Sequence, residues 1–342
     1  MPDVIVVGAG VVGLSVAFHL QERGASVVVV ERSGVGAGAS GVQPGGVRQQ
    51  WGTRVNCVLA RESVAFWGDV QERLRMRVDP GFRACGYLFL AHSEETLARL
   101  RANVVLQNEL GVPSRILSPA EAADAVPGLV VSSVVGASWC AEDGYFDRPQ
   151  AVVEAFGALA DVQIRRVAAL SELEADVIVV AAGVDTPLLL PELPIVAEVR
   201  HLFFSEPVRE RLLEPLVVSA ERRLAAKQLG DGRVLASDLG GSDRAHVRAG
   251  IEELLPQLSF VPLPLLVDGT YDVTPDHQAI LGRVRDNVWV AAGFSGHGFM
   301  LAPAVGRILA DAIVDGKEDE ALRILDAARF AEGRLVPEPQ VV

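Results

Sequence analysis

The chain has 342 residues, half of them apolar, with 33 glycines and a formal net charge of −13. This length allows two substructures with adjoining cores, and the composition is typical of an α/β protein with deeply buried strands. The acidic balance argues against nucleic acid and anionic membranes as partners, since both require a basic surface, but it is compatible with a small anionic substrate bound by a local arginine.

The three cysteines and six histidines are scattered and show no paired spacing. We therefore predict no metal site and a reduced, cytoplasmic environment. The first apolar strand begins at about residue 3, which leaves no room for a removable signal sequence. The apolar run over residues 4–20 contains glycines and is followed at once by another strand, so we predict a buried strand and helix there and no membrane span.

Residues 3–33 have the pattern of a strand, a helix and a second strand. Val4–Val7 is all apolar, as expected of a parallel strand buried on both faces. The sequence GAGVVG follows and opens a helix predicted over residues 11–23. A second apolar run, Val27–Val30, ends at Glu31. This order predicts a nucleotide-binding βαβ unit.

The glycine spacing has a chemical reason. Gly8 allows a tight turn, Gly10 lets the backbone approach a pyrophosphate, and Gly13 lets the helix pack closely on the strand. The helix N-terminus then presents free amides and a positive dipole end to the anion. Glu31 lies at the tip of the second strand, where a carboxylate can accept hydrogen bonds from a ribose and repels a 2′-phosphate. By itself this unit fits NAD and FAD equally well.

The later elements continue an α/β pattern. The glycine-rich segment 36–51 predicts a loop along the cofactor. Alternating apolar and charged residues over 195–272 predict a half-solvated antiparallel sheet. We expect further strands over 87–91, 175–183 and 288–293, and helices over 54–76, 93–111, 149–160 and 299–316. A capping-box sequence at 118–121 marks the start of one more helix.

We therefore predict a Rossmann-like parallel-sheet domain and a second domain built on a mainly antiparallel sheet. Both are discontinuous in the chain. The nucleotide-binding domain is expected to comprise residues 1–80, 140–190 and 275–342, and the substrate domain residues 81–139 and 191–274.

Four separated motifs carry a family resemblance. They are GAGVVG with Glu31, the GAGASG loop with Ser40, ADVIVVAAG at 175–183, and YDVTPDHQAILG at 271–282 followed by AAGFSGHGFMLAPAVG. In this order and over nearly the whole chain, they resemble the FAD-dependent amine and amino-acid oxidases, the family of D-amino-acid oxidase, glycine oxidase and sarcosine oxidase. The chain is more similar to the sarcosine and proline branch.

The resemblance implies an extended FAD, with its ADP on the first βα unit and its flavin ring against residues 45–51 and 294–300. We expect the FAD to be non-covalent, because Gly269 stands where the sarcosine branch has a flavin-linking cysteine and the loop 36–51 contains no histidine. The residues that we predict to bind the cofactor are Gly8, Gly10, Val11, Val12, Gly13, Glu31, Arg32, Ser40, Gly45, Gly46, Val47, Val167, Ala182, Gly183, Gly293, Gly296, His297, Gly298, Phe299 and Met300.

The candidate catalytic residues also follow from the resemblance. Tyr271 replaces the carboxylate-binding arginine of glycine oxidase and is similar to the sarcosine type, whose early arginine is matched by Arg48. Met300 replaces that branch's lysine, and His297 lies next to the ring. A lysine that assists the oxygen reaction in that branch has only a loose match in Lys227. The sequence leaves open whether Arg48 instead serves loop carbonyls or an FAD phosphate, and whether Tyr271 is a packing residue.

These inferences predict an FAD-dependent oxidoreductase that oxidises the C–N bond of a small secondary amino acid to an imine, by hydride transfer to flavin N5. Oxygen or another acceptor would reoxidise the flavin. Two alternatives stay open: the flavin subunit of a multi-subunit amino-acid dehydrogenase that passes electrons to a protein partner, and a catalytically weakened FAD-binding module.

Overall fold

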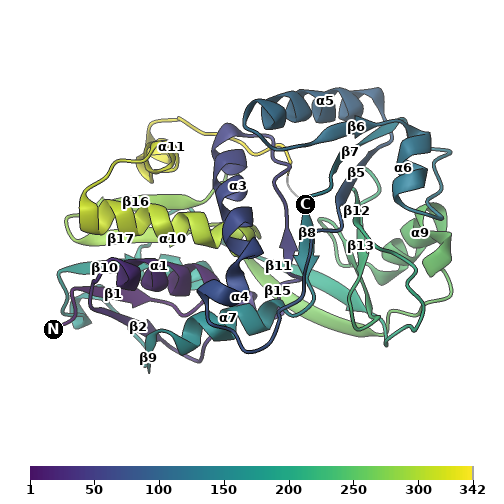
Figure 1. The fold of residues 1–342 in the computed structure, drawn as a ribbon. Helices are drawn as coiled ribbons and strands as arrows, with labels where there is room; N and C mark the ends of the chain where they lie inside the picture. Colours follow the sequence, from purple (N-terminus) through teal and green to yellow (C-terminus); the bar gives the residue numbers. More distant parts are fainter. Residues whose placement is uncertain (341–342) are drawn as a thin grey trace.

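The computed structural model of the protein describes residues 1–340, and its strands form two large sheets and one small one (Figure 1). In the six-stranded sheet only the β16–β17 pair is antiparallel, and the other neighbours are parallel. Its strands, in spatial order, are β16 (Ile280–Arg285), β17 (Val288–Ala292), β10 (Val177–Val180), β1 (Val4–Val7), β2 (Val27–Glu31) and β9 (Asp161–Ile164).

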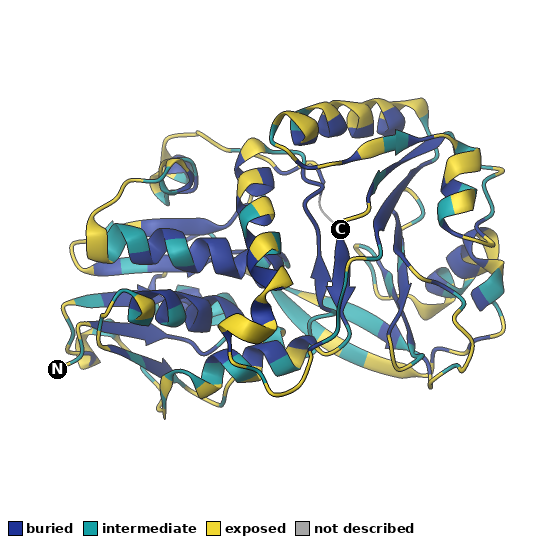
Figure 2. Cartoon of the chain, viewed as in Figure 1, coloured by how far each residue is buried: buried dark blue, intermediate teal, exposed yellow. Residues whose placement is uncertain are grey.

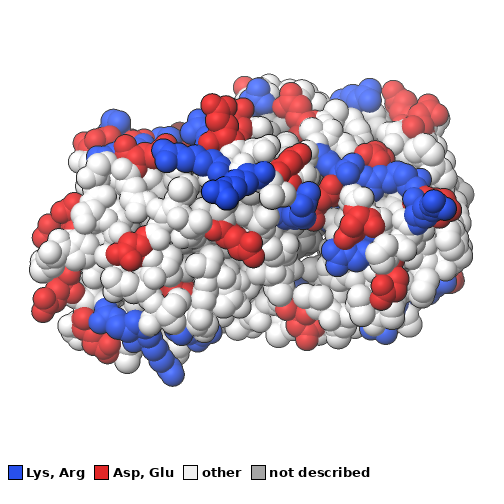
Figure 3. All heavy atoms as spheres, turned by 60° about the horizontal axis from the view of Figure 1, so that its bottom comes forward, with Lys and Arg blue, Asp and Glu red and all other residues white. Residues whose placement is uncertain are grey.

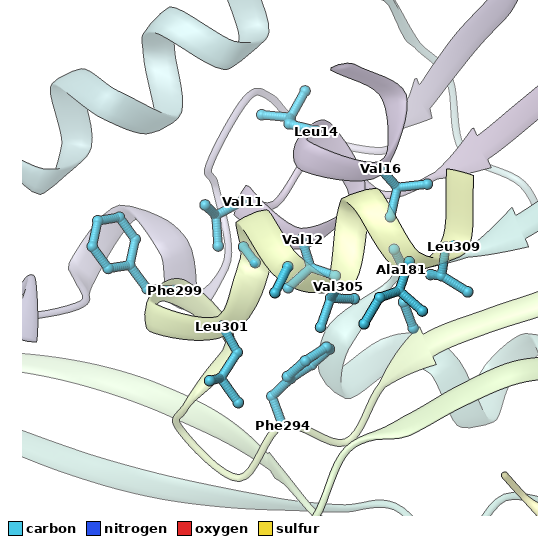
Figure 4. Close-up of a cluster of buried hydrophobic side chains, with 14 of the residues drawn as sticks. Val11, Val12, Leu14, Val16, Ala181, Phe294, Phe299, Leu301, Val305 and Leu309 are labelled. Atoms are coloured by element: carbon cyan, nitrogen blue, oxygen red, sulfur yellow. The ribbon is translucent and has the colours of Figure 1, made fainter. Parts of the chain in front are cut away.

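The centre of this sheet is buried on both faces, as its apolar strands predict (Figure 2). One face is covered by α1 (Val11–Glu22) and α10 (Gly298–Asp315), whose apolar side chains share one buried cluster (Figure 4). The two helices approach closely at Gly306, where a Cβ would lie 2.7 Å from the carbonyl oxygen of Ser15. A glycine is therefore required at this crossing.

The eight-stranded sheet is antiparallel except where β12 runs parallel to β5. Its strands, in spatial order, are β15 (Leu265–Val273), β11 (Val196–Phe204), β14 (Val234–Asp238), β13 (Leu224–Gln228), β12 (Leu216–Ser219), β5 (Tyr87–Ala91), β7 (Gly136–Cys140) and β6 (Arg115–Leu117). A small antiparallel sheet consists of β3 (Gly46–Val47), β8 (Gly144–Phe146) and β4 (Phe82–Arg83). The predicted combination of a Rossmann-like sheet and a mainly antiparallel sheet is confirmed.

The remaining helices lie outside the sheets. They are α2 (Ala39–Val42), α3 (Arg54–Gly68), α4 (Val70–Arg73), α5 (Glu94–Glu109), α6 (Pro119–Ala125), α7 (Pro149–Ala158), α8 (Thr186–Leu189), α9 (Arg244–Leu254), α11 (Glu320–Ile324) and α12 (Ala328–Ala331), with short 3₁₀ helices η1 (Leu170–Glu172), η2 (Gly183–Asp185) and η3 (Pro256–Leu258).

The helices predicted over 93–111 and 149–160 are present as α5 and α7, whereas α9 lies within residues 195–272, which were predicted to form strands only. The capping box is present, with Ser118 and Glu121 bonding to each other's backbone amides. The helix predicted over 54–76 is instead divided into α3 and α4, because Asp69 leaves the helical conformation directly after Gly68, a poor helix former. The edge strand β9 was not predicted.

We propose the domain division given above, and the distribution of strands supports it. All strands of the six-stranded sheet fall in residues 1–80, 140–190 and 275–342. Apart from Cys140 at the end of β7, the eight-stranded sheet falls in 81–139 and 191–274.

Within the part of the chain that the structure describes there is no membrane-spanning helix, and the face shown in Figure 3 has no broad basic area. None of the helices in residues 1–340 is both long enough and apolar enough to cross a bilayer. On the face shown in Figure 3, acidic and basic side chains are interspersed among apolar and neutral ones, so the described residues form no continuous basic field on that face.

Candidate functional site

The turn between β1 and α1 contains glycines that no larger residue can replace without rearrangement. Gly8 has φ +111°, and a Cβ there would lie 2.3 Å from the carbonyl oxygen of Ala181 on the neighbouring strand. A Cβ on Gly13 would lie 2.1 Å from the carbonyl oxygen of Gly8. The bare backbone thus lets the helix, the turn and strand β10 pack together and leaves amides exposed to a ligand.

Two polar side chains bind the amides of this turn. Ser40 Oγ accepts a hydrogen bond from the Val11 amide at 2.9 Å, in place of a capping side chain on Gly10. Glu31 accepts from the Ala9 amide through Oε2 at 2.9 Å and from the Ser33 amide through Oε1 at 2.8 Å. Glu31 is therefore fixed at the end of β2, with lone pairs left for a further donor.

One long cavity of about 480 Å³ begins at this turn and extends between the two large sheets. Its first part is lined by the ends of β1, β2 and β10 and by the segment 165–168. Its inner part is lined by Gln43, Pro44, Arg200, Leu202, residues 269–272, Phe294, Gly296, Gly298 and Phe299. The cavity thus connects a nucleotide-type turn with a chamber beside the antiparallel sheet.

The cavity brings many of the predicted residues together, although their individual roles stay predictions. It is lined by Gly8, Gly10, Val11, Val12, Glu31, Arg32, Ser40, Val167, Ala182, Gly183, Tyr271, Gly296, Gly298 and Phe299. The other predicted residues do not line it: Gly13, Gly45, Gly46, Val47, Arg48, Gly293, His297 and Met300.

Tyr271 forms one wall of the inner chamber. Its ring packs on Gly296, where a Cβ would lie 2.3 Å from the ring, and burial raises the pKa of its hydroxyl. Arg200 on the neighbouring strand places its guanidinium carbon 5.6 Å from the ring centroid and forms an ion pair with Glu198. Sequence reasoning missed Arg200, because one charge in an alternating strand carries no signal of the face it occupies.

Asp272 was also missed. Its carboxylate accepts a hydrogen bond from the Gly293 amide at 2.7 Å, and its carbonyl accepts from the Ser295 amide at 2.9 Å. Burial raises the pKa of this carboxyl to about 6. Asp272 thereby fixes the turn between β17 and α10, where Ser295 has a positive φ of 51°.

Arg48 is fully buried directly after β3. Its Nη1 donates to the carbonyl oxygen of Gln50 at 2.8 Å, and its Nη2 donates to that of Gln340 at 2.6 Å. The guanidinium carbon lies 3.7 Å from the ring centroid of Trp51. Within residues 1–340 no carboxylate lies at ion-pair distance from Arg48 and its Nε has no acceptor, so its charge is not neutralised by a direct partner.

A buried network supports the segment that carries Arg48. Asp143 accepts from the Gln49 amide at 2.8 Å and from Gln50 Nε2 at 3.1 Å, and Gln50 also accepts from Ser138 Oγ. Burial raises the pKa of Asp143 to about 6. Asp143 thus holds the two residues that follow Arg48.

Aromatic contacts connect this segment with the cavity. Trp51 meets the ring of His297 edge-on at 4.5 Å, and His297 lies between the cavity-lining Gly296 and Gly298. Burial lowers the pKa of His297 well below its usual value, so the imidazole is neutral. The buried Met300 lies in the first turn of α10, where its carbonyl accepts from Trp67 Nε1 at 3.3 Å.

Lys227 lies on β13 and is almost completely buried. Its Nζ donates to the carbonyl oxygen of Pro44 and lies 4.2 Å from the ring centroid of Tyr145. Burial lowers the pKa of Lys227 to about 7. Lys227 therefore holds the loop residue Pro44, which lines the cavity.

Comparison with known proteins gives this arrangement a family. Residues 3–312 match the family described as FAD dependent oxidoreductase (DAO). The chain belongs to this family. The parallel sheet, the glycine turn and the long cavity are thus parts of an FAD-dependent oxidoreductase.

Three relatives illustrate the likeness of this FAD-dependent oxidoreductase to known proteins. The crystal structure of L-proline dehydrogenase from P. horikoshii has a TM-score of 0.90 and 26% identity, covering 98% of this chain and 99% of that one. Glycine oxidase from Geobacillus kaustophilus is 27% identical over 92% of this chain and 93% of its own. FAD-dependent oxidoreductase domain-containing protein 1 from Xenopus laevis is 26% identical over 92% and 79%. Some curated relatives are longer, and this chain spans less than half of their length.

The residues of the cavity fit FAD. Side-chain-free backbone at Gly8 and Gly10 leaves room for a pyrophosphate at the N-terminus of α1, and Glu31 is placed for a ribose at the end of β2. The inner chamber ends at the N-terminus of α10, whose free amides favour negative charge. We propose that FAD is held without a covalent bond, with Gly269 in the chamber wall.

Proposed function

We propose that this oxidoreductase converts the C–N bond of a small secondary amino acid into an imine, which water then hydrolyses. The observation that carries this proposal is the single cavity that joins the glycine turn to the chamber of Tyr271 and the α10 N-terminus. The printed names of L-proline dehydrogenase and glycine oxidase support an amino acid as the substrate. When bound, FAD supplies the group that accepts a hydride from the carbon next to nitrogen.

We propose that the substrate carboxylate is held by Arg48 with the hydroxyl of Tyr271. Arg48 is the stronger candidate than Arg200, because Arg200 is already paired with Glu198 whereas Arg48 has only carbonyl acceptors among the described residues. Since Arg48 does not line the cavity, this role requires a local rearrangement of the segment from Arg48 to Trp51 when substrate binds.

The proposed reaction relies on fixed electrostatics and requires no dedicated side-chain base. Amides at the N-terminus of α10 would stabilise the negative charge that the cofactor gains. His297 is neutral, buried and outside the cavity lining, so it packs behind the turn and does not take a proton from the substrate. Positioning of a neutral amine over the cofactor is therefore the main contribution of these residues.

An anaerobic absorbance screen tests the proposed function. The holoprotein is mixed with glycine, sarcosine, L-proline and D-amino acids, and loss of the flavin absorbance is followed. We expect rapid bleaching by a secondary amino acid and slow or no bleaching by the matching amine without a carboxylate. Absence of bleaching by every amine would overturn the proposal and favour a binding module.

The electron acceptor is a separate question that the same preparation answers. Oxygen admitted to the bleached protein restores the absorbance with release of peroxide if the protein is an oxidase. Reoxidation by an artificial dye, without peroxide formation in air, would instead favour a dehydrogenase that passes electrons to a partner subunit.

A further inference from the structure

The last described residues cross from the six-stranded sheet to the start of α3. In Figure 1 the yellow trace runs from the region of α11 past α3. Asp276 fixes the middle of this C-terminal segment, residues 334–340, because its carboxylate accepts from the Val336 amide and its carbonyl accepts from the Glu338 amide at 3.1 Å. The segment is thus attached by specific hydrogen bonds.

Glu338 binds the N-terminus of α3 from outside that helix. Its Oε1 accepts from the Gly52 amide at 2.8 Å, and its Oε2 accepts from Thr53 Oγ1 at 2.6 Å and Asn56 Nδ2 at 3.0 Å. Thr53, the N-cap residue, makes no capping bond with its own side chain. Glu338 is only 3% exposed, and a carboxylate at this end of a helix is favoured by the free amides and the dipole.

Gln340 connects this anchor with Arg48. Its amide donates to Glu338 Oε1 at 2.9 Å, and its side-chain oxygen accepts from Asn103 Nδ2 at 3.2 Å. Its carbonyl oxygen accepts from Arg48 Nη2 at 2.6 Å. Glu338 therefore constrains Arg48 from two sides, through Gln340 and through Gly52 in the segment that follows Arg48.

We propose that the C-terminal segment supports the substrate site from outside the cavity, with Glu338 as a positioning residue that orients Arg48. The inference rests on the proposed role of Arg48 in binding the substrate carboxylate. Nη1 and Nη2 each retain one N–H beyond those bonded to the Gln50 and Gln340 carbonyls, and Nε retains its own. The two carbonyls thus fix the plane of the guanidinium, and its remaining donors become available to a carboxylate once the segment from Arg48 to Trp51 rearranges.

The test measures carboxylate binding without turnover. Pyrrole-2-carboxylate is a planar analogue of proline that has no hydrogen on its Cα to give up, and pyrrole lacks the carboxylate. Dissociation constants of both are measured by titration calorimetry on the FAD-loaded wild type, Glu338→Gln and Arg48→Met. Glu332→Gln is the matched control. Glu332 is exposed, precedes the segment and pairs with Arg334 at the surface.

We expect Glu338→Gln to weaken pyrrole-2-carboxylate about tenfold, the effect of misplacing one charged hydrogen-bonding group, with FAD content and pyrrole binding unchanged. Glu332→Gln should bind as the wild type does. If Glu338→Gln does not fold, Asn103→Ala loosens Gln340 alone and should weaken the same ligand about threefold.

Three results would overturn the inference. One is an unchanged dissociation constant in Glu338→Gln while amide hydrogen exchange at Gly52 rises, which would make the segment a structural anchor only. Another is tighter binding, which would mean that the Gln340 carbonyl competes with the ligand for Arg48. A third is an unchanged constant in Arg48→Met, in which case the proposed carboxylate clamp fails as well. If Arg48→Met weakens pyrrole-2-carboxylate binding and Glu338→Gln does not, the role of Glu338 is rejected and the carboxylate clamp stands.

Discussion

Asp276 and Arg329 form a bidentate ion pair in which both side chains are fully buried. Arg329 Nε and Nη2 donate to the two carboxylate oxygens at 2.9 and 3.0 Å, and the pKa of Asp276 is held below its usual value by this partner. Arg329 also donates to the carbonyl oxygens of Leu325 and Gln278. The pair thus connects the start of β16 with the region of α11 and α12, and Asp276 adds the C-terminal segment.

Arg329→Met should lower the free energy of unfolding by about 3–5 kcal/mol, because it leaves the Asp276 carboxylate buried without its cation. Urea unfolding followed by circular dichroism measures the loss. Arg334→Met is the control and should cost less than about 1 kcal/mol, since the Arg334 side chain is exposed and its partners are surface carboxylates. Equal losses in the two variants would contradict the buried pair's importance.

Gly13→Ala should reduce FAD binding. The added Cβ would lie 2.1 Å from the Gly8 carbonyl oxygen, so the β1–α1 turn that faces the pyrophosphate must shift, at a cost of about 1–3 kcal/mol. The measurement is the flavin-to-protein ratio after purification, together with the dissociation constant for added FAD. Gly68→Ala is the matched control, because nothing lies within 4 Å of its Cβ position. Full FAD content in both variants would count against this site.

Replacing the two arginines near the chamber separates their roles. Arg48→Met should lower kcat/KM for the best amino acid, which corresponds to a loss of about 2 kcal/mol of transition-state stabilisation. The value of kcat/KM for the matching amine without a carboxylate should be unchanged. Arg200→Met should change kcat/KM less than about threefold, because Glu198 already neutralises Arg200. A larger loss of kcat/KM in Arg200→Met than in Arg48→Met would indicate that Arg200 binds the substrate carboxylate. Arg200 lies in the chamber wall beside the ring of Tyr271.

Lys227→Met should remove a pH dependence of stability. Burial lowers the pKa of Lys227 from its ordinary 10.5 to about 7. Below pH 7 both folded and unfolded chains bind the proton, and the cost of burying the charge is fully present. Between about pH 7 and 10 the unfolded chain binds more protons, so this group makes stability rise with pH, by at most about 1.4 kcal/mol per unit.

Urea unfolding at about pH 6, 7, 8 and 9 covers the acidic end and most of this window. It shows whether the contribution of Lys227 to stability rises or falls with pH. The stability of Lys227→Met relative to wild type should be highest at the acidic end and should decline as the pH rises. Lys317→Met is the control, since Lys317 is exposed and pairs with acidic residues that raise its pKa. If the difference in the free energy of unfolding between Lys227→Met and wild type does not vary with pH, the pKa of Lys227 is not lowered by burial.

Local sequence determined the nucleotide half of the protein. The apolar run Val4–Val7, the glycines after it and Glu31 lie within one βαβ unit. Because these residues are close together in the chain, their spacing in the sequence is enough to predict how they are arranged. The same holds for α10 after the turn at 293–297, whose start and end the glycines mark. These parts of the fold and the family resemblance were therefore predictable from the residues.

Only the tertiary structure decided the surroundings of the candidate substrate site. Arg48 meets Gln340 and the Arg48 segment meets Asp143 across long separations in the chain, and no local pattern encodes such contacts. The face on which Arg200 lies depends on the register of β11 with β15, which pairs Arg200 with Gly269. The sequence by itself indicated that a dinucleotide cofactor is bound, because that site is local, whereas packing of distant segments decided the partners of Arg48 and Arg200.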